Sequence, residues 1–140
     1  MITNRTSNTR RPVRVGAAAV EMALTLPILF LLLFGVFELG RANLIRHTTE
    51  SAAYEAARVG IIPGASADEA KQAAQRVLQS VGVQQFQITV SPDPIVTGTK
   101  QISIDIKVPL DQNMTAARFV DGLEFTGKCT LSRELISELQ

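Results

Sequence analysis

The chain has 140 residues, of which 46% are hydrophobic, and its formal net charge is +1. This composition is too apolar for an intrinsically disordered protein, and the nearly neutral charge does not indicate a nucleic-acid-binding protein. The only cysteine, Cys129, excludes an intrachain disulfide and most simply packs as a small hydrophobic residue. The length leaves room for one small domain beside a membrane segment.

The first 16 residues carry the positive charge of the chain. They contain four arginines and no acidic residue. These arginines are Arg5, Arg10, Arg11 and Arg14. The positive-inside rule therefore predicts a cytoplasmic N-terminus and a C-terminal domain on the outer side of the membrane.

An apolar run follows at residues 15–37, and Glu21 is its only charged residue. Because about 20 apolar residues span a bilayer core of ~30 Å, we predict a transmembrane helix at residues 17–38. A buried helix in a soluble domain is the alternative, but so small a chain could hardly cover this run. Pro27 removes one helical hydrogen bond, and we expect it to kink or loosen the helix.

A cleaved secretory signal is a further alternative for the same segment. The small-x-small site at residues 40–42 contains Arg41. The apolar run also exceeds the roughly 7–15 residues usual in a signal peptide. Both features count against removal by an ordinary signal peptidase.

The position of Glu21 has two interpretations. In the first, the side chain reaches the cytoplasmic interface or pairs with Arg14, and has no further role. In the second, a peptidase cuts after Gly16, and Ala17 becomes a new N-terminus whose α-amino group has a pKa of ~7.7–8. Glu21 then lies one helical turn from that amine and can neutralise it in its own chain or in a neighbouring chain. Because unpaired charge is costly in lipid, this pairing would drive and align helix association.

These residues carry a resemblance to a known family. The motif GAAAVE, with a basic leader before it and a long apolar helix after it, resembles the prepilin processing pattern. The longer segment RRPVRVGAAAVEMALTLPILFLLLFGVFELGRA, followed by ESAAYEAARVG, is similar to the TadE-like family. These are pilin-like proteins of the tight-adherence (Tad) type IV pilus assembly system. The similarity is dense over residues 11–60, thin beyond them, and returns faintly at CTLSRELI.

The resemblance implies a role for each residue of the motif. Gly16 would precede the cut, Ala17 would begin the mature chain, and Glu21 would be the charge that guides assembly. Met22 stands where the family often has an aromatic residue. The basic residues of the implied leader, residues 1–16, include Arg10, Arg11 and Arg14.

Residues 39–62 are expected to continue the helix outside the membrane, because no proline occurs between Pro27 and Pro63. Small residues recur there at helical spacing and allow close approach of another element. They are Ala52, Ala53, Ala56, Ala57 and Gly60. The sequence leaves open whether this face packs against other pilin-like helices, against the chain's own domain, or against both.

A second helix is predicted at residues 67–81. Pro63 and Gly64 end the first helix. Ser66 and Glu69 have the spacing of a capping box, in which each side chain bonds the backbone of the other residue.

Beyond this helix the hydrophobic period changes to two, which predicts strands at residues 86–90, 101–108 and 123–132. A short helical passage is expected near residues 114–119. Residues 63–140 would then form a small exported domain. The predicted fold class is α+β and pilin-like: a long N-terminal transmembrane helix runs into one further helix packed on a roughly three-stranded antiparallel sheet.

The sequence offers no catalytic or ligand-binding constellation. His47 is the only histidine, and one histidine with one distant cysteine cannot furnish a zinc site. Neither a phosphate-binding glycine loop nor a nucleophile with a recognisable base is present. We expect no enzymatic activity, no metal and no cofactor.

Two functions are therefore carried forward. In the first, the protein is a minor pilin or pseudopilin in the assembly of a Tad-type adhesive pilus and a substrate of a prepilin peptidase. Its expected partners are that peptidase, other pilin-like subunits and pilus-assembly proteins, with no nucleic acid. It would be a single-pass protein of the inner (cytoplasmic) membrane with a periplasmic or extracellular domain. In the alternative, the helix only tethers an exported ligand- or protein-binding module, and Glu21 is incidental.

Overall fold

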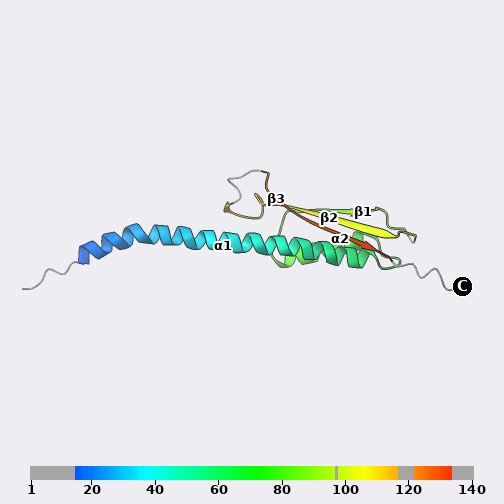
Figure 1. The fold of residues 1–140 in the computed structure, drawn as a ribbon, viewed down its shortest axis with the longest axis horizontal. Coiled ribbons are helices and arrows are strands. Elements are labelled where there is room, and N and C mark those ends of the chain that lie inside the picture. Colours follow the sequence, from blue (N-terminus) through cyan, green and yellow to red (C-terminus); the bar gives the residue numbers. More distant parts are fainter. Residues whose placement is uncertain (1–14, 97, 117–121, 134–140) are drawn as a thin grey trace, which may run out of the picture. The chain divides into compact units, whose positions relative to one another are not determined.

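The computed structural model describes residues 15–96, 98–116 and 122–133. Its elements follow in the order α1 (Val15–Gly60), α2 (Ala67–Ser80), β1 (Gln87–Ser91), β2 (Gln101–Pro109) and β3 (Glu124–Ser132) (Figure 1). The chain divides into two compact units, Met1–Val36 and Phe37–Gln140. The described part of the first unit is the beginning of α1, and the second unit holds the rest of α1 and the other elements. The predicted α+β layout is confirmed.

Helix α1 is continuous and contains Pro27 in its interior. The hydroxyl of Thr25 donates to the carbonyl oxygens of Glu21 at 2.9 Å and Met22 at 3.4 Å. This polar side chain in the apolar run is thus satisfied by the helix backbone. The helix ends at Gly60, and a turn follows in which Gly64 adopts a φ of 88°, a conformation that favours glycine.

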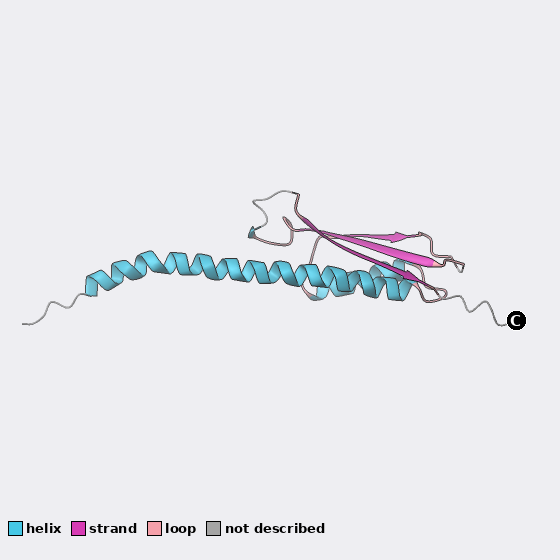
Figure 2. Cartoon of the chain, in the orientation of Figure 1, coloured by secondary structure: helices cyan, strands magenta, loops and turns pink. Residues whose placement is uncertain are grey.

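The hydrophobic core of the second unit lies between the later part of α1, helix α2 and one face of the sheet (Figure 2). Four alanines of α1 are fully buried in it: Ala52, Ala53, Ala56 and Ala57. The small-residue face of the helix therefore packs within the chain's own domain. Packing of these alanines against other subunits, which the sequence had left open, would require this core to open.

One close approach fixes how strand β3 lies on helix α1. A Cβ atom added to Gly127 would lie 2.5 Å from the carbonyl oxygen of Thr49 and 2.8 Å from its carbonyl carbon. Real Cβ atoms do not come so near to backbone atoms, so the strand needs glycine at this crossing. Thr49 is itself fully buried, and its hydroxyl donates to the carbonyl oxygen of Ile45 at 2.8 Å.

Helix α2 begins with the predicted capping box. The Ser66 hydroxyl accepts a hydrogen bond from the backbone N–H of Glu69 at 3.2 Å, and the Glu69 carboxylate accepts one from the N–H of Ser66 at 3.0 Å. The ammonium group of Lys71 lies 2.9 Å from the Asp93 carboxylate and joins α2 to the segment after β1. This hydrogen bond raises the pKa of Lys71 above its ordinary value.

The sheet is antiparallel with the strand order β1-β2-β3. Strand β2 is central and points its predicted apolar residues into the core, where they are fully buried: Ile102, Ile104, Ile106 and Val108. The opposite face is polar. There the hydroxyls of Ser103 and Thr130 are 2.9 Å apart, and the Lys107 ammonium lies 3.2 Å from the Glu124 carboxylate.

Some element boundaries differ slightly from the sequence predictions. Strand β1 begins at Gln87, and Phe86 packs against the core just before it. Strand β3 begins at Glu124. Of the passage predicted to be helical, Ala116 has 3₁₀ geometry, and residues 117–119 lie outside the described part of the chain.

The crossing of β3 over α1 gives a test of the fold. We expect Gly127→Ala to lower the free energy of unfolding by about 1–3 kcal/mol, because the new methyl group overpacks the contact with Thr49. The matched control is Gly40→Ala, an exposed position of the same helix where an added Cβ meets nothing within 4 Å. That change should be neutral or stabilising by up to ~1 kcal/mol. Urea unfolding of the detergent-solubilised chain measures both, and equal effects would contradict the packing described.

Candidate functional site

The predicted processing and assembly residues lie together at the start of α1. Gly16, Ala17 and Glu21 are all helical and exposed. A Cβ atom added to Gly16 would meet nothing within 4 Å. The predicted cleavage point is thus uncovered by the rest of the described chain. The leader arginines Arg5, Arg10, Arg11 and Arg14 lie outside the described residues.

Ala17 and Glu21 are four positions apart in a continuous helix. Residues with this spacing lie on the same helix face, with ~5–6 Å between their Cβ atoms. Within the described residues, Glu21 forms no ion pair. Its carboxylate is therefore accessible to a positive charge at position 17 or on another chain.

The helix between these residues and the domain exposes almost only apolar side chains. Its most apolar 18-residue segment has a mean hydropathy of 2.3 and is 0% buried by the rest of the described chain. Leu31 and Val36, for example, are 71% and 70% exposed. Apolar surface costs roughly 25 cal/mol per Å² in water, so a face of this size calls for lipid or protein cover. By its length and composition, this helix could cross a membrane.

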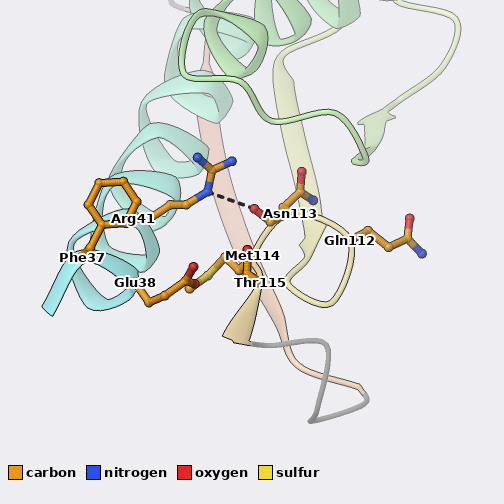
Figure 3. Close-up of a pocket in the computed structure, with 7 residues that line it drawn as sticks. All are labelled: Phe37, Glu38, Arg41, Gln112, Asn113, Met114 and Thr115. Carbon is orange, nitrogen blue, oxygen red and sulfur yellow. Dashed lines mark hydrogen bonds between the residues drawn. The ribbon is translucent and has the colours of Figure 1, made fainter. Parts of the chain in front are cut away.

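A polar cavity lies in the second unit, next to the point where the apolar run ends (Figure 3). Its volume is about 370 Å³. Helix α1 contributes Phe37, Glu38 and Arg41, and the segment after β2 contributes residues 112–115. Glu38 is only 6% exposed, although it carries a carboxylate.

Asn113 holds the loop side of this cavity in place. Its side-chain oxygen accepts hydrogen bonds from the N–H groups of Gln84 at 3.0 Å and Gln85 at 3.4 Å. Its side-chain nitrogen donates to the carbonyl oxygens of Gln85 at 2.9 Å and Pro109 at 2.7 Å. Since the Asn113 side chain is thus saturated, it fixes the loop but has little capacity left for a ligand.

In the rest of the described structure, the side chains that could act in catalysis or bind a metal ion do not lie together. The described residues contain no cluster of three or more histidine, cysteine, aspartate or glutamate side chains suited to a metal ion. His47 is exposed, and its Nδ1 lies 4.0 Å from the Glu50 carboxylate. Cys129 is half-buried on strand β3 and packs against the core, consistent with its interpretation as a small hydrophobic residue.

Fold and site together define a class of protein: a small α+β domain attached to a single N-terminal helix that has the properties of a membrane anchor. The family model described as TadE-like protein matches residues 16–58. The match runs from the predicted cleavage point to the last turn of α1. It confirms the resemblance carried by the motif: over this segment the chain is similar to the TadE-like family. No curated protein and no solved structure matches the chain.

Sequence reasoning missed the polar cavity. There, Arg41 was considered only as part of the small-x-small site at residues 40–42, and Glu38 was not singled out. A signal was present, because a glutamate and an arginine three positions apart follow directly on a long uncharged segment. Nothing in the sequence, however, indicated that residues 112–115 fold back against this turn of the helix.

The division into two units predicts how the chain behaves without its apolar start. A fragment of residues 37–140 contains the whole described core, so we expect it to be soluble and to unfold cooperatively. The full chain should remain in the membrane fraction after an alkaline carbonate wash. Fractionation and circular dichroism measure both properties. A fragment that is unfolded or membrane-bound would contradict the division.

Proposed function

We propose that the protein is a pilin-like subunit, a minor pilin or pseudopilin, that acts in the assembly of a Tad-type adhesive pilus. It acts by association and not by catalysis. The proposal is supported above all by one observation: the TadE-like match begins at Gly16, at the head of an apolar helix that nothing in the described chain covers. In the membrane, an uncovered helix of this kind is available to pack against the helices of other subunits.

In the proposed mechanism, the chain is first inserted into the inner membrane with its N-terminus in the cytoplasm. A prepilin peptidase then cuts between Gly16 and Ala17 and removes the leader arginines. The new α-amino group lies at the membrane interface, where an uncompensated charge is unfavourable. Glu21 supplies the compensating carboxylate, since it lies one turn along the same helix face.

The pairing can form within a chain or between chains. Pairing between chains gives adjacent helices a fixed axial offset, because each amine must meet a carboxylate one turn away. The exposed apolar side chains of residues 22–36 then pack against a neighbouring helix and leave the lipid. The domain stays outside the membrane and keeps its own core closed.

Cleavage is tested by N-terminal sequencing of the membrane-extracted protein. With a prepilin peptidase present, we expect the chain to begin at Ala17. Gly16→Val should block the cut, because the peptidase must accept the residue before the bond. Gly35→Val is the matched control, since an added Cβ meets nothing within 4 Å at either glycine. A wild-type chain that still begins at Met1 or Ile2 would refute processing.

The charge at Glu21 is tested by Glu21→Gln, which keeps the shape of the side chain and removes its charge. We expect unchanged membrane insertion but association with other pilin-like subunits weakened by about tenfold or more, which corresponds to the loss of ~1.4 kcal/mol of pairing free energy. Quantitative co-purification from membranes measures this. The control is Glu50→Gln, an exposed carboxylate of the same helix that lies 3.6 Å from Arg46. Equal co-purification by wild type and Glu21→Gln would count against the proposed role.

A further inference from the structure

The polar cavity beside Glu38 has the features of a ligand site. Its volume of about 370 Å³ falls within the range of small-molecule pockets, roughly 300–1,000 Å³. Its wall carries one acidic and one basic side chain, Glu38 and Arg41, both from the same turn of α1.

Glu38 is a buried carboxylate with little compensation from the protein. Within the described chain its one hydrogen bond comes from the backbone N–H of Ala116 at 3.4 Å, which is long for such a bond. Glu38 as a residue is only 6% exposed, and a carboxylate with so little access to water is unfavourable unless a cation or several donors meet it. Glu38 lines the open cavity, so a ligand could supply the missing positive charge.

Arg41 does not supply that charge. Its Nε donates to the backbone carbonyl oxygen of Asn113 at 3.1 Å, and no ion pair joins Arg41 to Glu38 among the described residues (Figure 3). Residues three apart on a helix are near enough to pair, yet the loop contacts hold these two apart. The cavity therefore presents two separate charges of opposite sign and fits a ligand that carries both.

The place of the cavity along the chain indicates where such a ligand comes from. Glu38 is the first charged residue after the uncharged run of residues 22–37. In a helix that spans a membrane, this position falls at the headgroup layer on the far side. Its neighbours Phe37 and Leu39 are 69% and 72% exposed, as expected of residues that meet acyl chains.

We propose that this cavity binds the headgroup of a phospholipid with a primary amine, as in phosphatidylethanolamine. The ammonium group donates to the Glu38 carboxylate, and the phosphate accepts from the Arg41 guanidinium. A quaternary ammonium has no N–H to donate and fits the carboxylate less well. The inference rests on the membrane-anchor part of the proposed function and would make the junction between helix and domain a lipid-specific contact.

The test uses the full chain in detergent micelles that contain equal amounts of three lipids with the same acyl chains. These are phosphatidylethanolamine, phosphatidylcholine and phosphatidylglycerol, and native mass spectrometry counts the lipids retained. We expect phosphatidylethanolamine to be retained at least fivefold over the other two. Glu38→Gln should abolish this preference, and Arg41→Gln should lower retention of all three lipids. The double change of Arg46→Gln and Glu50→Gln, an exposed pair of the same helix, should leave retention unchanged.

A second arm needs no variant and so does not depend on whether Glu38→Gln folds. Retention should fall stepwise as the amine is methylated once, twice and three times. Equal retention of all three lipids, or no dependence on methylation, would overturn the proposal. Free phosphoethanolamine that binds as tightly as the lipid would also overturn it, because the source would then be a soluble ligand. Failure of the anchor itself would be distinguishable, since the chain would then not enter the micelles.

Discussion

Helix α1 is one continuous helix whose two parts suit two different environments. In the part that belongs to the first unit, the apolar side chains have no protein cover, so that surface is stable only in lipid or against other helices. In its second unit the same helix presents small residues, which allow α2 and the sheet to pack close to the helix axis. The crossing of Gly127 over Thr49 shows how near that packing is. A bulky residue on this face would push the sheet away, and a polar stretch in the first unit would remove the anchor.

This arrangement leaves little freedom for where assembly can occur. The alanine face is buried in the domain core, so in the proposed assembly the contacts with other subunits fall to the apolar stretch before it. Along that stretch Glu21 is the only charge. An apolar helix surface alone allows two helices to associate without a fixed axial offset between them. One carboxylate and one amine per chain, by contrast, specify the axial register of neighbouring helices. The proposed function thus follows from the contrast between the two parts of α1, and it does not require an active site.

Much of the fold could be predicted because local signals agreed with the tertiary structure. The capping box at Ser66 and Glu69, the alternation through strand β2 and the break at Pro63 each depend on short-range chemistry. The partner of the alanine face could not be predicted, since small residues at helical spacing suit any close neighbour. The polar cavity was missed for a similar reason. Glu38 and residues 112–116 are far apart in the chain, and only the folded structure brings that loop beside the carboxylate.

The central claim is that the carboxylate of Glu21 meets the amine of a processed Ala17. A carbodiimide joins a carboxylate to an amine only when the two are in contact, so it tests this pairing directly in the membrane. Subunits with and without heavy-isotope labels are mixed, cross-linked and digested, and mass spectrometry identifies the joined peptides. The account predicts an amide between the Ala17 amine and Glu21, and mixed labels would show that the bond joins two chains. A free Ala17 amine beside an unlinked Glu21 would contradict it.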